Sequence, residues 1–266
     1  MERRGLDAYG YFEREGSLGL VQPAFAAPVA AARGRIAEAY GPRLHSAYLY
    51  GSVPRGTARP GRSDLDLLLA LHREPCDEDR DTAEVLGRVL DQEFPETDGV
   101  GILLYGKDRL LSERERYDLG WFLACLCTPL LGADLAEHLP RYRPDSLLAR
   151  ETNGDLALVL ARWRERFEAA SEPAEYRRMS RGFSRHLVRT GFTLVMPRWG
   201  GWTSDLTESA EVFGRYYPRR AAQMRDAAAV ALAPVADRDV VRGYVEDLGP
   251  WLAAEYTARH GTKAPR

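Results

Sequence analysis

Lysine is nearly missing from this sequence: Lys107 and Lys263 are the only two, so almost all of the positive charge is arginine. The 39 Asp and Glu residues balance 37 Lys and Arg residues, which gives a formal net charge of -2. A protein that coats long nucleic acids normally carries a strongly basic domain. The charge balance therefore makes extensive nucleic-acid binding unlikely and leaves small or locally bound anions as partners.

Long apolar segments are missing as well. No stretch approaches the roughly 20 uninterrupted apolar residues that a membrane-spanning helix needs, and no apolar signal core follows the first residues. We therefore expect no membrane partner and a cytoplasmic protein. The three cysteines, Cys76, Cys125 and Cys127, cannot all pair with one another, so the sequence predicts reduced thiols that pack as small hydrophobic side chains.

Two common catalytic signatures are also absent. The sequence contains no Gly-x-Ser-x-Gly elbow and no Walker-type phosphate loop, and its five histidines show no metal-type spacing. Serine hydrolases and P-loop enzymes are therefore poor candidates. The composition is that of an ordinary globular protein, with 45% hydrophobic and 29% charged residues, and the chain is long enough for one large domain or two modest ones.

The hydrophobic patterns differ between the two halves of the chain. The first half predicts helix, strand, strand, helix and strand, at residues 27–40, 47–50, 64–70, 82–94 and 100–105. Two prolines and an Asp-Ser pair within residues 139–146 indicate a domain junction. Every later pattern is helical, at residues 147–170, 172–194, 204–216, 219–231 and 237–256. We therefore predict an α+β protein with one domain at residues 1–142 and an all-helical domain at residues 143–266.

Two carboxylates stand two residues apart at the start of a predicted strand. Alternate residues of a strand point to the same face, so Asp64 and Asp66 would lie side by side. Such a pair of like charges is unfavourable unless a divalent cation lies between them, and oxygen ligands of this kind suit Mg²⁺, which also binds phosphate oxygens. The pair predicts a metal and a phosphate together.

A short glycine-containing turn precedes this pair. Gly51 and Ser52 follow the strand at residues 47–50, where backbone N–H groups and a hydroxyl can hold phosphate oxygens. Arg55 lies close enough in sequence to reach the same anion with a forked contact. Ser63 is placed to cap or orient the entry to the next strand. These four residues are the predicted nucleotide contacts of the first half.

The order and spacing of these residues carry a family resemblance. The string GSVPRGTARPGRSDLDLLL at residues 51–69 resembles the Gly-Ser, spacer, Ser-Asp-x-Asp signature of the DNA polymerase β-type nucleotidyltransferase superfamily. The resemblance implies a mixed sheet with flanking helices at residues 1–142. It also implies that Gly51 and Ser52 hold nucleotide phosphates, that Asp64 and Asp66 bind one or two Mg²⁺ ions, and that ATP or another nucleoside triphosphate is the co-substrate.

The same resemblance implies a third carboxylate from a neighbouring strand. Asp98, just before the strand at residues 100–105, is the candidate for this metal-binding and catalytic role. Glu93 and Glu96 are rivals, and the alternative is that Asp98 is a turn residue.

The helical half resembles, more loosely, the helical domain of aminoglycoside-type adenylyltransferases. The carrying stretches are LVRTGFTL at residues 187–194, GWTSDLTESA at residues 201–210, and Tyr217-Pro218. Those enzymes often have lysine after the serine of the second stretch, where this chain has Asp205 after Ser204. This departure weakens the case for a phosphate contact there and for an aminoglycoside as substrate.

Arginines recur every four residues in the same half, at positions 177, 181, 185 and 189, which would stack them on one helix face. In one interpretation Glu172 or Glu175 neutralises this stripe; in the other, Arg185 and Arg189 reach the triphosphate. Trp199 and Trp202 would either stack on a base or acceptor ring, or anchor their loop to the core.

These features predict a Mg²⁺-dependent nucleotidyltransferase that moves a nucleoside monophosphate, AMP from ATP, to a hydroxyl of a small-molecule acceptor such as an antibiotic. The acidic pI of about 6.3 and the compact helical half favour this interpretation. Two alternatives stay open: transfer to a protein or RNA acceptor, and a non-catalytic nucleotide-binding or antitoxin-like protein.

Overall fold

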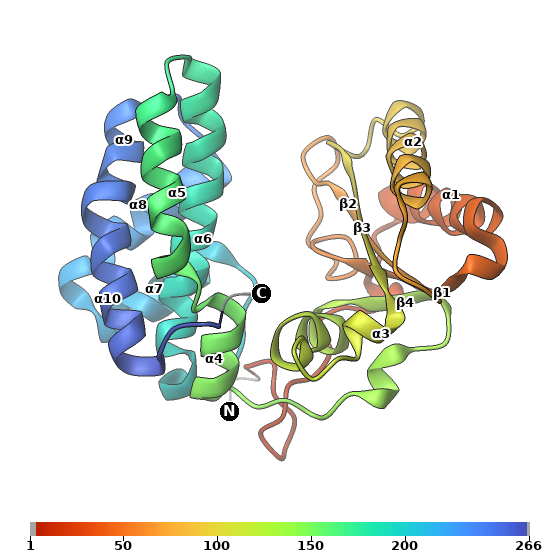
Figure 1. Ribbon diagram of the computed structural model, residues 1–266, viewed down its shortest axis with the longest axis horizontal. Coiled ribbons are helices and arrows are strands. Elements are labelled where there is room, and N and C mark those ends of the chain that lie inside the picture. The colour runs from red at the N-terminus through yellow and green to blue at the C-terminus, as the bar shows by residue number, and fades with distance from the viewer. Residues whose placement is uncertain (1–3, 265–266) are drawn as a thin grey trace. The chain divides into compact units, whose positions relative to one another are not determined.

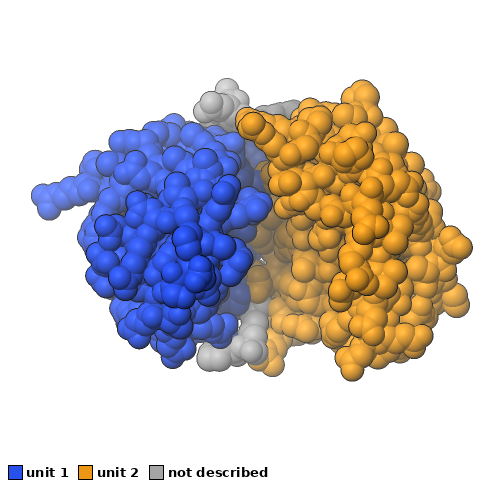
Figure 2. Space-filling view, turned by 90° about the horizontal axis from the view of Figure 1, so that it is seen from above, with its two compact units in different colours: residues 1–12, 142–266 blue, residues 13–141 orange. Residues whose placement is uncertain are grey.

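The computed structural model describes residues 4–264. The chain forms two compact units (Figure 2). One, here called the sheet unit, is Glu13–Arg141; the other, the helical unit, contains the chain from Tyr142 onward together with the N-terminal residues up to Phe12. No helix of the described residues is both long enough and apolar enough to span a membrane.

The sheet unit alternates helices and strands in the predicted order (Figure 1). Its main elements are α1 (Pro23–Tyr40), β1 (Leu44–Tyr50), β2 (Leu65–Leu71), α2 (Asp77–Glu93), β3 (Val100–Gly106), α3 (Lys107–Leu110) and β4 (Thr128–Gly132). Three 3-10 helices, η1 (Leu18–Leu20), η2 (Gly41–Arg43) and η5 (Leu135–His138), and two π-helical segments, η3 (Arg116–Gly120) and η4 (Phe122–Leu126), complete it. The strand order is β3-β2-β1-β4. Because β2 and β3 run parallel while β1 is antiparallel to β2 and β4, the sheet is mixed, as expected.

Alternation along β2 divides the core into two layers. Leu65, Leu67 and Leu69 pack with α1 and α2 on one face of the sheet. Leu68 and Ala70 face the opposite way, into a second cluster built from the chain after β3. This is the period of two expected for a strand buried on both faces. Asp66 belongs to the second face, which fixes the side of the sheet on which its carboxylate lies.

The sequence pattern does not predict β4. This strand lies at the edge of the sheet and pairs with β1 through an irregular register around Tyr48. It contains Pro129, which cannot donate a ladder hydrogen bond and is tolerated at edges. The apolar run that contains β4 therefore shows no alternation that would predict a strand. Cys125 and Cys127 lie beside it as buried free thiols, as expected, whereas Cys76 is exposed.

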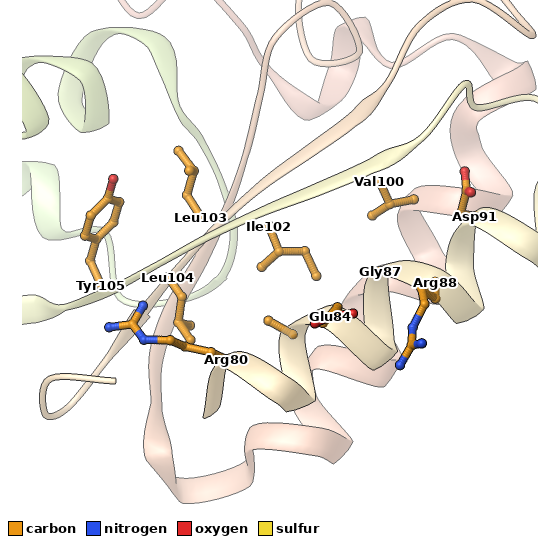
Figure 3. A pocket seen from close by; sticks show the side chains of 11 residues that line it. Arg80, Glu84, Gly87, Arg88, Asp91, Val100, Ile102, Leu103, Leu104 and Tyr105 are labelled. Atoms are coloured by element: carbon orange, nitrogen blue, oxygen red, sulfur yellow. The ribbon is translucent and has the colours of Figure 1, made fainter. Parts of the chain in front are cut away.

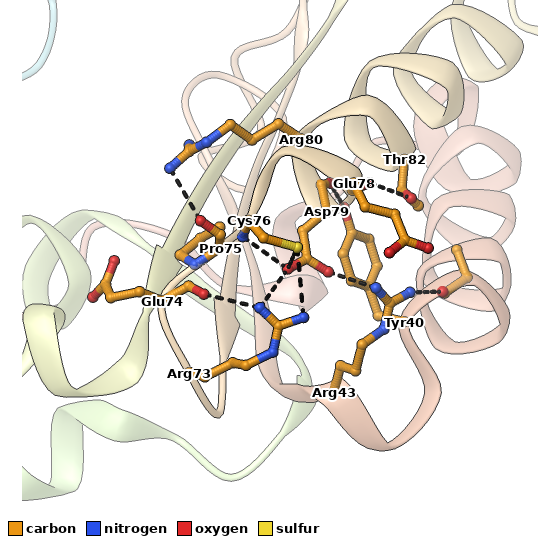
Figure 4. Close-up of polar contacts among 11 residues, drawn as sticks. Tyr40, Arg43, Arg73, Glu74, Pro75, Cys76, Glu78, Asp79, Arg80 and Thr82 are labelled. Carbon is orange, nitrogen blue, oxygen red and sulfur yellow. Dashed lines mark hydrogen bonds and ion pairs between the residues drawn. The ribbon is translucent and has the colours of Figure 1, made fainter.

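Helix α2 begins five residues before its predicted start, because Asp79 is a buried cap (Figure 4). The Asp79 carboxylate accepts hydrogen bonds from the backbone N–H of Cys76 at 3.0 Å and from its thiol at 3.2 Å. Arg43 and Arg73 form ion pairs with it at 2.5 and 3.1 Å. The hydroxyl of Tyr40 donates to the Asp79 carbonyl. The network ties α2 to α1 and to the end of β2.

From Tyr142 onward, the regular elements of the helical unit are all helices among the described residues, and an isolated antiparallel bridge joins Leu6 to Phe12. The helices are α4 (Ser146–Asn153), α5 (Leu156–Ala169), α6 (Pro173–Trp199), α7 (Leu206–Tyr216), η6 (Pro218–Arg220), α8 (Ala221–Leu232), α9 (Arg238–Gly243), the π-helical η7 (Tyr244–Leu248) and α10 (Gly249–His260). The predicted helix at 147–170 is two helices, because Gly154 ends α4. The predicted helix at 237–256 is likewise divided by η7 and extends to His260.

The N-terminal residues differ from the expectation of a domain at residues 1–142, because they pack with the helical unit. The backbone N–H of Phe12 donates to the carbonyl of Tyr142, and its ring meets that of Trp202 edge-on with centroids 6.1 Å apart. Arg4 donates to the Trp199 carbonyl and lies over its ring. Contacts between residues so distant in sequence are not encoded in local periodicity.

Candidate active site

The turn after β1 is shaped around the carboxylate of Asp66. Gly51 has φ of +79°, a left-handed conformation that favours glycine. A Cβ atom at this position would overlap Oδ2 of Asp66. Glycine is therefore required here both by the backbone and by the close approach of the carboxylate. The structure brings together Gly51 and Asp66, which lie fifteen positions apart in the printed sequence.

Asp66 lies in β2 between two neighbouring strands. Its register partners are Tyr50 on antiparallel β1 and Gly101 on parallel β3. A Cβ at Gly101 would stand 3.3 Å from Oδ1 of Asp66, and one at Gly99 would stand 3.6 Å from Oδ1 of Asp64. Glycines thus border both carboxylates, which keeps side chains of β3 from covering the carboxylate oxygens.

Tyr50 is a site residue that the motif did not point to. Burial is the main cause that raises the pKa of its phenol, and the negative charges of Asp66 and Asp64 raise it further. The ring packs edge-on against Phe122, with centroids 5.0 Å apart. Both aspartates therefore act on the same phenol, which stays protonated at neutral pH. The one sequence feature that could have pointed to Tyr50 is its position directly before Gly51.

The predicted phosphate ligand Arg55 is engaged within the protein. Its guanidinium forms an ion pair with Glu15 at 3.4 Å. The turn that carries it is closed by the Thr57 N–H, which donates to the Ser52 carbonyl at 3.1 Å. The Ser17 N–H donates to the Pro54 carbonyl, so the segment before α1 holds the turn in place. A phosphate at Arg55 would share the guanidinium with Glu15.

Ser63 and Asp98 join the two loops at this end of the sheet. The Ser63 hydroxyl accepts a hydrogen bond from the Arg59 N–H at 2.9 Å. Its carbonyl accepts from the Asp98 N–H at 3.1 Å. Asp98 itself is exposed. Ser63 therefore links the loop before β2 to the turn before β3.

The structure does not place Asp98 in a three-ligand metal site. Within residues 4–264, no three acidic, histidine or cysteine side chains converge in a group able to hold a metal ion. Asp98 lies in the turn before β3 rather than in the strand, and the strand position opposite Asp66 is Gly101. The role of Asp98 as a third metal ligand beside Asp64 and Asp66 therefore stays a prediction.

The remaining predicted residues belong to α6 of the helical unit. Arg185 is half-buried and Arg189 is exposed. The Glu175 carboxylate accepts the N–H groups of Ser171 and Glu172, so it caps α6. Glu175 therefore has a capping role in addition to any effect on the arginine stripe.

Trp199 and Trp202 favour the anchoring alternative. Both indoles meet Phe192 edge-on, with centroids 5.6 and 5.4 Å apart. Trp202 also donates from Nε1 to the Ser204 hydroxyl at 3.1 Å. Together with the contacts from Arg4 and Phe12 described above, these rings hold the N-terminal residues against α6.

The sequence and the fold both resemble those of known proteins. Residues 32–106 match the family model described as a nucleotidyltransferase domain. The match begins in the middle of α1 and extends to the end of β3. The structure is similar to that of spectinomycin adenyltransferase AAD(9) from Enterococcus faecialis, determined with ATP and spectinomycin. That likeness has a TM-score of 0.56 and 12% identity, and it covers 87% of this chain and 98% of that chain. No curated protein matches the sequence significantly.

Proposed function

We propose, from a chain whose residues 32–106 form a nucleotidyltransferase domain, that the protein transfers AMP from ATP to a hydroxyl of a small-molecule acceptor. The observation that carries the proposal is the placement of the Asp66 carboxylate against the Gly51 turn, with Asp64 two residues earlier in the chain. Metal-binding carboxylates and a phosphate-holding turn then meet at one point. The likeness to an adenyltransferase determined with ATP supports ATP as the donor.

The donor set fits Mg²⁺. This ion prefers oxygen ligands, and it is usually held by one or two carboxylates, with waters and substrate phosphates filling the other positions. Asp64 and Asp66 would hold it, and it would supply charge neutralisation at the reacting phosphate. A site with two protein carboxylates is sufficient for this role. Asp98 is the proposed third carboxylate.

The chain's own residues then perform two tasks. The backbone and hydroxyl of the Gly51-Ser52 turn bind the phosphates and fix the α-phosphorus. Gly99 and Gly101 leave space beside the carboxylates for the reacting groups. The acceptor oxygen forms a bond to the α-phosphorus while the bond to the leaving pyrophosphate breaks, and the hydroxyl proton passes to solvent.

The acceptor is proposed to be a small hydroxylated molecule, of the class to which antibiotics such as spectinomycin belong. The acidic net charge of the chain disfavours an RNA acceptor. Arg185 and Arg189 are proposed to contact the triphosphate from the helical unit, and Arg55 to contact it from the turn beside Glu15. Each arginine would add a charge-assisted hydrogen bond to a phosphate oxygen.

The test is label transfer from α-labelled ATP in the presence of Mg²⁺ and a panel of hydroxylated small molecules, proteins and RNA ends. Label on a small molecule, with release of pyrophosphate, is the expected result. Label on a protein or on RNA would show that the acceptor is a macromolecule instead of a small molecule. Parallel assays with α-labelled GTP, CTP and UTP would define the base preference.

A second candidate is nucleotide binding without transfer. It is favoured by the absence of a three-ligand group among residues 4–264 and by glycine at the β3 position opposite Asp66. In the same experiment this candidate predicts saturable ATP binding and no label on any acceptor.

A further inference from the structure

Strand β1 contains a bulge at His45. Leu44 pairs with Leu71 of β2 and Ser46 pairs with Ala70, so no residue of β2 lies opposite His45. Consecutive residues of a regular strand point to opposite faces, whereas a bulge changes the direction of a side chain. Here Nδ1 of His45 lies 3.0 Å from the buried hydroxyl of Ser46, within hydrogen-bond distance. The bulge therefore brings the imidazole to its neighbour's hydroxyl.

A chain of hydrogen bonds fixes which ring nitrogen of His45 carries the proton. The Ser46 hydroxyl donates to the Tyr48 hydroxyl at 3.3 Å, so it accepts from Nδ1 of His45. The Tyr48 hydroxyl in turn donates to the Ala133 carbonyl at 3.5 Å and accepts the Leu135 N–H at 2.8 Å. Assigned from this network, Nδ1 is protonated and Nε2 keeps its lone pair. Metal-binding histidines usually donate their other ring N–H to a protein acceptor in this way.

A second imidazole, that of His72, lies beside the first. His72 directly follows β2, and its backbone N–H donates to the Arg43 carbonyl at 3.0 Å, which holds the end of β2 near the start of β1. The ring centroids of His45 and His72 are 5.2 Å apart. Two imidazoles that bind one tetrahedral Zn²⁺ with Zn–N distances of about 2.0–2.1 Å have ring centres roughly 5 Å apart. The pair therefore has the spacing that one tetrahedral ion requires.

The surroundings keep the His45 imidazole in the form that binds metals. Burial is the main cause that lowers its pKa, and the positive charges of His72 and Lys107 are among those that lower it further. Metal ions bind the neutral imidazole. Lys107 would repel a cation, but a carboxylate lies close to it in the fold: a Cβ at Gly106 would stand 2.5 Å from Oε1 of Glu74. This negative charge offsets part of the repulsion.

The pair lies apart from the other candidate sites of the sheet unit. His45 is at the start of β1 and His72 follows the end of β2, whereas Gly51 follows the end of β1 and Asp66 is near the start of β2. The two sites are therefore at opposite ends of these antiparallel strands. A groove of about 600 Å³ runs along α2 and β3 (Figure 3), and none of the residues that line it is a histidine.

We propose that His45 and His72 bind a divalent transition-metal ion, and that Zn²⁺ is the ion whose geometry they fit. Imidazole nitrogen suits Zn²⁺, whereas Mg²⁺ prefers oxygen ligands. Within residues 4–264, no three acidic, histidine or cysteine side chains converge on one point, so water completes the coordination. The bound ion would join the start of β1 to the end of β2 and stabilise the folded chain.

The test is calorimetric titration of the full chain with Zn²⁺ in excess Mg²⁺, which competes for sites built from carboxylates. Saturable binding of a single ion, accompanied by a higher melting temperature, is the expected result. His45→Gln and His72→Gln are each expected to weaken the binding at least about tenfold. Ser46→Ala keeps both ligands but removes the acceptor of the Nδ1 proton, so it should weaken the binding roughly tenfold.

The controls are Cys76→Ser and His186→Gln, which remove an exposed thiol near His72 in sequence and a histidine of the helical unit. Both should bind Zn²⁺ like the parent chain, and circular dichroism should show that every variant is folded. A parent chain without saturable binding would overturn the proposal, as would either ligand variant that binds like the parent. Parent-like affinity in Ser46→Ala would indicate an adventitious ion only and would overturn it equally.

Discussion

Asp64 and Asp66 are the residues on which the proposed chemistry depends. If they hold Mg²⁺, Asp64→Asn removes half of the ligand charge while keeping the shape of the side chain. We predict a loss of label transfer of roughly a thousandfold, equivalent to about 4 kcal/mol. Thermal unfolding should be nearly unchanged, because Asp64 is half-buried and outside the core clusters. Asp81→Asn, an exposed aspartate on α2, is the matched control; turnover near that of the control would refute the mechanism.

Gly51 is predicted to tolerate no side chain. Gly51→Ala forces alanine into a positive φ, which costs about 1–2 kcal/mol, and its Cβ displaces the Asp66 carboxylate. We expect both lower stability in urea unfolding and loss of transfer. Full activity in this variant would contradict a role of the Asp66 carboxylate in the reaction at its present position.

Gly101 permits a finer test of the same carboxylate. In Gly101→Ala the new Cβ would stand 3.3 Å from Asp66 Oδ1, a tight contact that the carboxylate relieves by shifting a few tenths of an ångström. We expect weaker Mg²⁺-dependent nucleotide binding with little change in unfolding. Gly34→Ala in α1 meets no atom within 4 Å and should be neutral or stabilising by about 0.5–1 kcal/mol. Equal behaviour of the two variants would contradict the proposed role of Gly101.

Residue identity and spacing were sufficient to predict that Gly51 and Asp66 lie close together, because adjacent strands bring them together. They were insufficient for Arg55, whose partner Glu15 comes from a segment forty positions earlier. The position of Asp98 in the turn, one residue before a glycine with φ of +149°, is set by loop geometry. Spacing along the chain does not carry that information.

At the scale of elements, α2 depends on its buried cap. Asp79→Ala removes the acceptor for the Cys76 N–H and leaves Arg43 and Arg73 without their shared carboxylate. Both arginines are partly exposed, so the expected loss is about 2 kcal/mol in urea unfolding rather than the larger cost of a fully buried pair. Asp77→Ala, an exposed position in the same helical turn, should cost clearly less. A loss no greater than that of the control would show that the cap contributes little.

The same carboxylate gives a pH dependence of known sign. Burial raises the pKa of Asp79, but the hydrogen bonds from Cys76 and the charges of Arg73 and Arg43 outweigh it, so the pKa lies below its ordinary value. Its contribution to stability is therefore present above the unfolded pKa of about 3.9 and is lost as the pH falls through the folded value. Melting temperatures from pH 7 to pH 3 should fall less steeply in Asp79→Asn than in the parent chain. Parallel curves would contradict this assignment.

Hydrophobic period predicted β1, β2 and β3 well, because each is a short apolar run bounded by turn residues. It failed for β4, where Pro129 and the preceding π-helical residues break the pattern. The pattern also placed the start of α2 too late in the chain. Asp77 and Glu78 are polar residues typical of a loop, and only the capping role of Asp79 shows that they belong to the helix. Charged first turns suit a helix N-terminus, but their partners lie on other elements.

For the whole molecule, the change of pattern near residue 142 coincides with the boundary between the sheet unit and the helical unit. The assignment of the N-terminal residues did not, because it depends on the contact between Phe12 and Trp202. Such a contact between rings 190 positions apart has no local signature. The unit that carries the nucleotidyltransferase domain is consequently shorter at its start than the sequence suggested.

The central claim is that Asp64, Asp66 and the Gly51-Ser52 turn hold a metal-bound nucleoside triphosphate. Its most direct test is calorimetric titration of the full chain with a non-hydrolysable ATP analogue in Mg²⁺. We predict saturable binding to the parent chain and to Asp81→Asn, and binding at least about tenfold weaker, or a loss of about 1.4 kcal/mol, for Asp64→Asn/Asp66→Asn. Equal affinity in all three proteins, or the same affinity after Mg²⁺ is chelated, would contradict the account.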